Sequence, residues 1–272
     1  MAAIDRKRLR RSFHLHSGEY DRHARVQKKV VERLSGLIAA GAPPLMVLDV
    51  GCGTGALVSR IAAYFPSARC VGVDLAVGMC VAARERRGIQ NTMEFAAGDA
   101  ERLPFRDSHF DLVVSASVFQ WLDRLDAAFA EAFRVLAPGG MFRFALFGGA
   151  TLTELRSSYR QASLDIRGER EERTMEFFSA GEVEAVLTEA GFDEAHVCSE
   201  MEVEEYPDVP SLLRAIRGIG AGTTTPPAAR GLGERRIMLA MMDIYGREYG
   251  RNGMVPATYE VLYGTGRKPD AP

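Results

Sequence analysis

Between residues 45 and 147 the chain alternates short apolar runs with helical patterns, and this alternation constrains the fold more than any other feature. The apolar runs are LMVLDV (45–50), CVGVD (70–74), TMEFAAGD (92–99), FDLVVSAS (110–117) and MFRFALF (141–147). The intervening helical stretches are 56–65, 76–88 and 123–136. Strands that alternate with helices run parallel, with right-handed crossovers. The sequence therefore predicts a doubly wound α/β sheet that binds ligands at the carboxyl ends of its strands.

The flanking segments add further elements to this core. Residues 17–38 have apolar positions three or four apart, which predicts one amphipathic helix before the sheet. A capping box of Ser179 and Glu182 marks the start of a later helix. We expect helices at 151–163, 181–191, 210–220 and 233–250, strands at 195–206 and 257–267, a turn at 137–140 and a mobile loop at 221–233.

Composition and charge exclude several classes of protein. With 47% hydrophobic and 26% charged residues the chain has ordinary globular composition. No apolar run approaches the ~18 residues of a membrane-spanning helix, and the basic N-terminus lacks the apolar segment of a secretory signal. The four cysteines form no C-x-x-C pair and cluster with none of the five histidines. We therefore expect a cytoplasmic protein with reduced, buried thiols and no metal.

The segment DVGCGTG (49–55) directly follows the first expected strand and has the form of a ligand-binding glycine loop. Gly51 and Gly53, with Ala56, satisfy the dinucleotide fingerprint in its loosest form. Gly51, Gly53 and Gly55 also have the spacing of the loop in S-adenosylmethionine (AdoMet) enzymes. The glycines alone leave both interpretations open.

Three acidic residues decide between these two ligands. Asp49, Asp74 and Asp99 each end an expected strand, so they line one edge of the sheet. Carboxylates there would repel a pyrophosphate by about 1 kcal/mol each. AdoMet has no phosphate, and its ammonium, sulfonium, ribose hydroxyls and adenine amine all suit carboxylates. We expect Asp49 to face the ammonium, Asp74 the ribose diol and Asp99, with the Ala100 N–H, the adenine; the alternative for any one of them is a helix cap.

Five motifs in this region occur in a familiar order: DVGCGTG, GVD, GDAERLPF, FDLVVS and LAPGG. Together they resemble the class I AdoMet-dependent methyltransferases, which have a Rossmann-like fold. The resemblance implies a seven-stranded sheet with an antiparallel last strand and lid helices from both ends of the chain. We expect a single domain, 1–272, with an N-terminal lid helix (13–40), an AdoMet-binding core (45–148) and substrate-side helices and closing strands (149–272). The candidate cofactor-binding residues are Asp49, Gly51, Gly53, Gly55, Asp74, Leu75, Asp99, Ala100 and Ser115.

Segments outside those motifs carry a narrower resemblance that covers most of the chain. FHLHSGEYDRHARVQKKVVERL (13–34), SASVFQWLDRLDAAFAEAFRVLAPGG (115–140), FGGATLTELRSSY (147–159) and GRNGMVPATYEVLYG (250–264) are similar to the malonyl-[acyl-carrier protein] O-methyltransferases of biotin synthesis. A related mitochondrial assembly factor, a protein arginine hydroxylase, shares much of this pattern. The alternatives are that hydroxylase, a methyltransferase for another small acceptor and, disfavoured by the three acids, an NAD(P) oxidoreductase.

Carboxyl methylation agrees with the residues on the acceptor side. A carboxylate of pKa ~4 is already ionised near neutral pH, so no general base is required, and none is evident. Rate would come from alignment and desolvation. We expect Arg156 to hold the acceptor carboxylate, Tyr20 to cover sulfonium and carboxylate, and Gln120 and Trp121 to line the acceptor's path. The alternatives are surface ion pairing for Arg156 with Glu154 or Asp165, and core packing for Tyr20 and Trp121.

The N-terminal segment has an uneven charge. Residues 1–29 hold nine Lys and Arg against three acids, a local charge of +6, which leaves −8 on the rest of a chain whose net charge is −2. Because acyl-carrier proteins are acidic, we expect this basic arm to dock the malonyl-loaded carrier. The alternative is a solvated face. Nucleic acid is not an expected partner, since few aromatic residues interleave with the basic ones.

Overall fold

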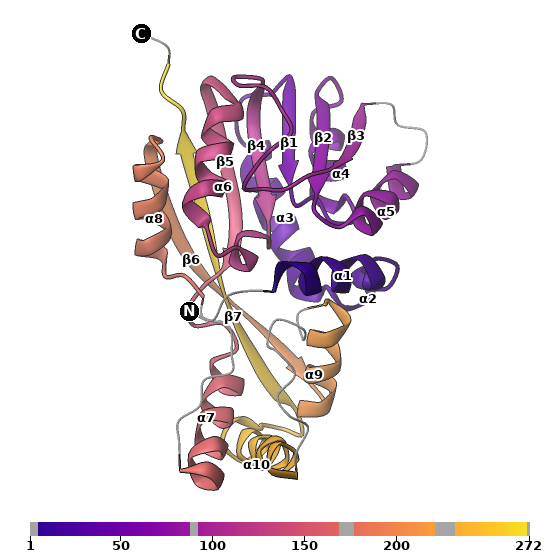
Figure 1. Ribbon diagram of the computed structural model, residues 1–272, viewed down its shortest axis with the longest axis vertical. Coiled ribbons are helices and arrows are strands. Elements are labelled where there is room, and N and C mark those ends of the chain that lie inside the picture. Colours follow the sequence, from indigo (N-terminus) through magenta and orange to yellow (C-terminus); the bar gives the residue numbers. More distant parts are fainter. Residues whose placement is uncertain (1–4, 88–91, 169–176, 221–231, 271–272) are drawn as a thin grey trace.

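The computed structural model describes residues 5–87, 92–168, 177–220 and 232–270. Its strands form one seven-stranded sheet in the order β3-β2-β1-β4-β5-β7-β6, with β7 antiparallel to both of its neighbours and the other pairs parallel (Figure 1). The predicted doubly wound sheet with an antiparallel last strand is therefore confirmed. The strands are β1 (Met46–Val50), β2 (Arg69–Asp74), β3 (Met93–Ala97), β4 (Phe110–Ala116), β5 (Leu136–Phe147), β6 (Asp193–Tyr206) and β7 (Val255–Arg267).

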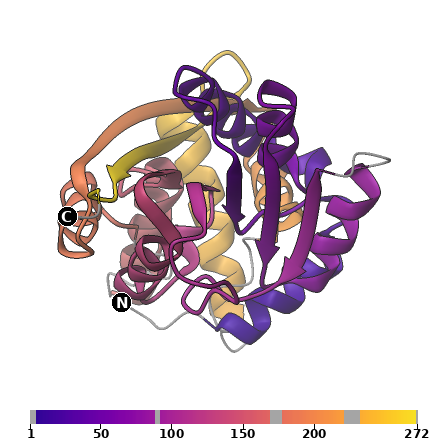
Figure 2. The same ribbon diagram turned by 90° about the horizontal axis from the view of Figure 1, so that it is seen from above.

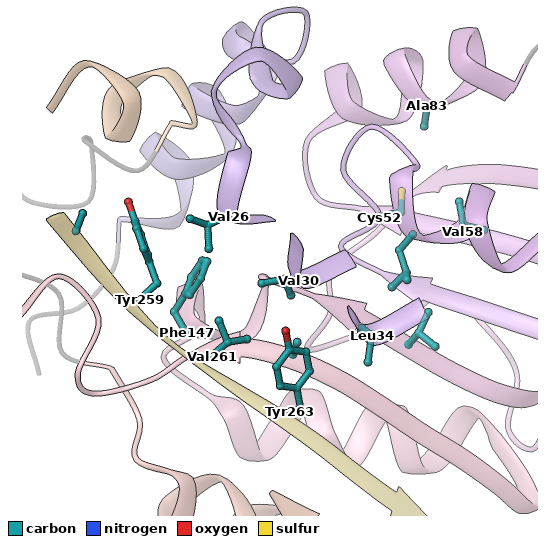
Figure 3. Close-up of a cluster of buried hydrophobic side chains, with 14 of the residues drawn as sticks. Val26, Val30, Leu34, Cys52, Val58, Ala83, Phe147, Tyr259, Val261 and Tyr263 are labelled. Carbon is teal, nitrogen blue, oxygen red and sulfur yellow. The ribbon is translucent and has the colours of Figure 1, made fainter. Parts of the chain in front are cut away.

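Helices cover both faces of the sheet (Figure 2). On one face lie α3 (Arg25–Ala39), α4 (Ala56–Tyr64) and α5 (Val77–Arg87), and on the other α6 (Leu125–Val135) and α8 (Ala180–Glu189). Each face buries its own apolar cluster. Figure 3 shows part of the first, where Val30 and Leu34 of α3 lie near Phe147 of β5 and Tyr263 of β7. Burial on both faces explains the near-continuous apolar sequence of the inner strands.

A second layer of structure lies beyond the carboxyl edge of the sheet (Figure 1). There β6 and β7 continue as a two-stranded ribbon, because they pair as far as Tyr206–Val255, whereas β5 leaves β7 at Phe147–Val261. Three helices accompany this ribbon: α7 (Thr153–Arg167), α9 (Val209–Gly218) and α10 (Leu232–Tyr249). Among the described residues, no helix has both the length and the apolar character needed to cross a membrane.

The N-terminal region differs from the prediction of one helix over 17–38 within a lid helix at 13–40. It contains three helices: α1 (Arg6–His16), α2 (Tyr20–His23) and α3. The side chain of Asp5 caps α1 by accepting a hydrogen bond from the Arg8 N–H at 3.0 Å. A turn at 17–19 ends it, and the non-helical backbone of Ala24 (φ −78°, ψ 53°) separates α2 from α3. Helix α1, which carries five of the basic residues, lies across the strand ends (Figure 1).

Several smaller predictions can be compared with the structure. The capping box of Ser179 and Glu182 is confirmed. The expected turn at 137–140 is part of β5, where Gly139 and Gly140 pair through their backbones with Lys268. The four cysteines are free, but Cys198 is exposed rather than buried. Most of the loop predicted at 221–233 lies outside the described residues.

Candidate active site

The carboxyl ends of β1, β2 and β3 open into a cleft roofed by α1. It encloses about 780 Å³ of space, part of it open to solvent. Candidate residues from the core line one side, and side chains of α1 line the other. These residues include Gly51, Gly53, Asp74, Leu75, Asp99 and Ala100 from the core, and Arg6, Leu9, Arg10 and Phe13 from α1.

The glycine loop is shaped by backbone conformations that glycine adopts without strain. Gly51 has φ +70°, and a Cβ there would lie 2.3 Å from a methyl carbon of Val118. Gly53 has φ +53° and open space above it, on the wall of the cleft. Gly55 has φ +80° and begins α4, where a Cβ would crowd Ala83 and Phe95. Gly51 and Gly53 thus face the cleft, whereas Gly55 serves the packing of α4.

Asp74 ends β2 and lies on the wall of the cleft. Its Oδ2 accepts a hydrogen bond from the Gly53 N–H at 3.0 Å and its Oδ1 one from the Ala76 N–H at 2.8 Å. Burial raises its pKa, and these two hydrogen bonds partly offset that rise. The carboxylate is therefore held in a fixed orientation, with lone pairs left for a ligand hydroxyl.

Asp49 lies inside β1 rather than at its end, and only 1% of its surface is exposed. It lines a second cavity that shares Gly51, Gly53 and Tyr20 with the first. Neither of its carboxylate oxygens has a hydrogen-bond partner among the described residues. Burial, with a smaller effect of nearby Asp74, raises its pKa to about 7, and the nearby Val58 backbone, which lies outside normal hydrogen-bond geometry, opposes this rise only slightly. A buried acid without a partner is costly unless a cation binds beside it, so this end of the site suits a ligand ammonium.

Asp99 lies two residues beyond the end of β3, beside an arginine that sequence analysis had assigned to a docking arm. Its Oδ1 accepts hydrogen bonds from Arg6 Nη2 at 2.6 Å and from the Glu101 N–H at 3.0 Å. Arg6 Nη1 also donates to Glu101 at 2.7 Å. The third acid of the cleft is therefore partly neutralised by the helix that covers it.

Two observations correct the set of expected cofactor residues. Ser115 is fully buried, and its Oγ donates to the Val50 carbonyl at 2.7 Å, so it joins β4 to β1 instead of lining the cleft. Sequence analysis also missed the role of α1, because residues 1–12 were interpreted by charge alone. The spacing of Leu9 and Phe13, one helical turn apart, was the available signal for an inward-facing helix.

A third cavity, of about 470 Å³, adjoins the first two on the side of the second layer. Tyr20 lines all three cavities. Phe13 packs edge-on against both Tyr20 and Trp121, with ring centroids 6.3 and 5.9 Å apart. The other walls of this cavity are largely apolar and come from distant parts of the chain; they include Phe147, Leu152, Phe177, Ile216, Ile219 and Tyr259.

Three of the four acceptor-side candidates line one cavity, and the fourth does not. Tyr20, Gln120 and Trp121 line the third cavity, so neither Tyr20 nor Trp121 is plain core. Burial, together with the charge of Asp74, raises the pKa of the Tyr20 hydroxyl above its usual value. Arg156, in contrast, lies apart from the residues lining these three cavities, and its Nη1 donates to the Gly149 carbonyl at 2.5 Å. Its buried Nε has no partner in the described part of the chain.

The surface alternative for Arg156 is not supported by the positions of its expected partners. Glu154 is buried and accepts hydrogen bonds from the backbone and side chain of Thr258. Asp165 accepts a hydrogen bond from Gln161 at 2.7 Å. Arg156 is half-buried, and its charge faces the segment that joins β5 to α7.

Comparisons with known proteins agree with this geometry. Residues 48–144 match the sequence model of a methyltransferase domain. The crystal structure of the YcgJ protein from Bacillus subtilis superposes with a TM-score of 0.60, covering 88% of this chain and all of that one (100%), at 19% identity. At that identity the likeness shows the fold alone. Fold and cleft define the chain as a class I methyltransferase.

Two relatives with higher sequence identity show which methyltransferase family this is. A malonyl-[acyl-carrier protein] O-methyltransferase of Geobacter sulfurreducens is 51% identical over 268 residues, covering 97% of this chain and 100% of the relative. Another, from Methylococcus capsulatus, is 36% identical and covers 89% of this chain and 86% of the relative. The chain belongs to the malonyl-[acyl-carrier protein] O-methyltransferase family. The expected resemblance is confirmed.

Proposed function

We propose that this enzyme transfers a methyl group from AdoMet to the free carboxylate of malonyl-[acyl-carrier protein], the step that primes pimeloyl synthesis for biotin. The observation that carries this proposal is the position of Tyr20, where a cleft lined by acids meets a largely apolar cavity. One side suits a cationic methyl donor and the other an acyl chain. Bound AdoMet supplies an electrophilic methyl group on its sulfonium.

The acids of the cleft bind the donor in the order in which they lie along the sheet. Asp49, buried and without a hydrogen-bond partner among the described residues, takes the ammonium. Asp74, oriented by two backbone N–H groups, takes the ribose diol. Asp99 and the Ala100 N–H lie at the adenine end with Leu75. Gly51 and Gly53 allow the donor to approach the backbone closely.

On the acceptor side, the protein's task is to align a carboxylate that is already ionised. The Tyr20 hydroxyl is protonated at neutral pH, as its raised pKa reinforces, and can donate a hydrogen bond to that carboxylate. Trp121 and Phe13 exclude water from the junction of the two cavities. Arg156 is the proposed cation for the carboxylate. It lies on α7 one turn beyond Leu152, a residue that lines the acceptor cavity, and its buried Nε has no partner among the described residues.

The partner is the acyl-carrier protein, and we assign its docking to the basic N-terminal helix. Ion pairs within the protein occupy some of the basic residues that could make this contact. Arg6 bonds Asp99 and Glu101, and Arg25 and Lys29 bond the buried Glu204. Lys7 and Arg11 are exposed on the outer side of α1 and are the main candidates.

We assign three roles to segments of a single domain. The N-terminal helices form a lid, the core (45–148) binds AdoMet, and the segment 149–270, which contains the second layer, encloses the acceptor. This division is supported by the lining of the acceptor cavity, which draws on all three segments.

The test is to incubate the enzyme with AdoMet and malonyl-[acyl-carrier protein] and to follow the mass of the carrier. The expected result is the gain of one methyl group in exchange for a proton, reversed by mild ester hydrolysis. Acetyl-[acyl-carrier protein], which lacks the carboxylate, is the control and stays unchanged. Methylation of a free small acid in preference to the carrier would favour a different acceptor.

A further inference from the structure

Gln120 is a buried polar residue on the largely apolar wall of the acceptor cavity. It lies in the short 3₁₀ helix η1 (Phe119–Trp121), directly after β4, and is 2% exposed. Its neighbours on the wall include Phe147, Phe177 and Ile219. An amide in such surroundings must have a hydrogen-bond partner for each end, or it destabilises the fold.

The neighbouring backbone determines which end of this amide is satisfied. Nε2 of Gln120 donates to the carbonyl oxygen of Ser117 at 2.8 Å. Ser117 is itself fixed, because its N–H donates to Ala145 at 2.7 Å and its φ is +59°. A carbonyl oxygen only accepts, so rotating the amide by half a turn would place two acceptors against each other. The orientation of the amide therefore follows from the chemistry of its neighbour.

Oε1 is consequently the end that remains for a ligand. It is buried and has no hydrogen-bond partner within the described ranges of the chain. As an oxygen with lone pairs and no proton, it can only accept. A substrate that fills this cavity satisfies Oε1 only by presenting a donor to it, which a carboxylate, a thioester carbonyl or a thioester sulfur cannot do.

We propose that Gln120 Oε1 accepts a hydrogen bond from an amide N–H of the acceptor's thioester arm. This inference rests on the proposed function, and it specifies how the site recognises its substrate class. In a malonyl thioester on a phosphopantetheine arm, the first N–H group lies a short way beyond the sulfur. Gln120 is thus a specificity-determining residue that distinguishes arm-borne malonyl groups from simple malonyl esters and free acids.

The test uses two small substrates that differ in one donor. One is the malonyl thioester of N-acetylcysteamine, which carries the amide N–H. The other is the malonyl thioester of 2-acetoxyethanethiol, in which an ester oxygen replaces that N–H. For the wild-type enzyme, kcat/KM should be about tenfold higher with the amide substrate than with the ester substrate. This ratio is the effect of one neutral hydrogen bond.

Three variants isolate the contribution of Oε1. In Gln120→Met the ratio of the two kcat/KM values should fall to about one, because the acceptor oxygen is lost. In Gln120→Glu it should persist, because a buried, protonated carboxyl donates to Ser117 and still accepts through its other oxygen. Thr151→Val is the matched control, since the Thr151 hydroxyl lines the same cavity but already bonds the backbone of Glu260. Its tenfold preference should be kept.

The possible outcomes are distinguishable. If Gln120→Met lowers both activities equally and keeps the tenfold preference, Gln120 only supports Ser117, and the inference is wrong. Equal activity of the wild-type enzyme on the two substrates also overturns it while leaving the proposed function intact. If the wild-type enzyme methylates neither these substrates nor malonyl-[acyl-carrier protein], the proposed function fails and the inference fails with it.

Discussion

Arg6 of α1 places its guanidinium 2.6 Å from Asp99 and 2.7 Å from Glu101, so the N-terminal helix is tied to the loop that follows β3. Asp99 lines the cofactor cleft, and so does Arg6 itself. The arginine thereby serves two purposes. It holds α1 over the cleft, and it offsets part of the negative charge gathered there.

Arg6→Ala should raise the KM for AdoMet about fivefold. The pairs are about one-third exposed, with 30% of Arg6 and 35% of Asp99 accessible, so together they contribute on the order of 1 kcal/mol to the contact between α1 and the cleft. Steady-state kinetics at fixed acceptor concentration measures the change. Arg22→Ala is the control, because Arg22 pairs with exposed Glu19 in the same region and should leave this KM unchanged. A lower KM in Arg6→Ala would mean that Arg6 competes with the adenine for Asp99.

Asp49→Asn should stabilise the ligand-free enzyme at pH 8. Burial raises the pKa of Asp49 from 3.8 to about 7, so the folded state holds a proton over a pH range in which the unfolded state has released it. This contribution to stability is present below about pH 4 and is lost as the pH rises through 7. Removing the charge should recover on the order of 4 kcal/mol at most.

Thermal unfolding of both proteins at pH 8 and pH 5 checks this prediction. The gain in Tm should be clear at pH 8 and smaller at pH 5, where folded wild-type Asp49 is still protonated but the unfolded chain has already released its proton. Asp111→Asn serves as a comparison, since Asp111 accepts two backbone N–H bonds and should lose stability on substitution at both pH values. An equal gain for Asp49→Asn at the two pH values would contradict the assigned pKa.

The same carboxyl should couple AdoMet binding to pH. A bound ammonium favours ionised Asp49, so the pKa of Asp49 falls when the ligand binds and a proton is released at pH values below about 7. The affinity for AdoMet should therefore weaken as the pH falls from 7.5 to 5.5, by up to about tenfold per unit. Calorimetry in buffers of different ionisation enthalpy measures the released proton. Asp49→Asn should bind weakly and release none.

Much of the core was predictable, because its sequence signals are local. Strand β4, for example, is a largely apolar run that is buried on both faces. Gly51 has a positive φ, and the glycine of the motif already indicates such a conformation. The spacing of Asp49, Asp74 and Asp99 fixed their common edge, since parallel strands end together. Such features follow from the neighbouring residues alone.

What the sequence left undetermined depends on contacts between distant segments. The ion pairs of Arg6 span 93 residues to Asp99 and 95 to Glu101, so the charge of α1 alone could not show that this arginine turns inward. The place of Ser115 at the end of a strand suggests a cleft residue, yet its hydroxyl donates to the Val50 carbonyl of β1. The division of the N-terminal segment into three helices depends on the turn at 17–19 and on Ala24, whose backbone conformation its residue type does not specify.

Arg156→Met should raise the KM for malonyl-[acyl-carrier protein] by tenfold to a hundredfold, the range expected for a lost hydrogen bond to a charged group. The KM for AdoMet should stay the same. Because Arg156 also bonds the Gly149 carbonyl, a structural role must be distinguished. Acetyl-[acyl-carrier protein], which has no carboxylate, is used as a competitive inhibitor. Equal weakening of inhibitor and substrate would show that Arg156 only supports the backbone near β5.

Reversing two outward charges should test carrier docking without disturbing the cofactor cleft. Arg10 lines that cleft, so the exposed pair Lys7 and Arg11 is the better choice. The double variant Lys7→Glu/Arg11→Glu should raise the KM for malonyl-[acyl-carrier protein] at least fivefold, since repulsion replaces attraction to an acidic partner. Its KM for AdoMet and for the malonyl thioester of N-acetylcysteamine should not change, and the difference from the wild type should shrink at high salt. Unaltered kinetics with the carrier at low salt would mean that this side of α1 is only a solvated face.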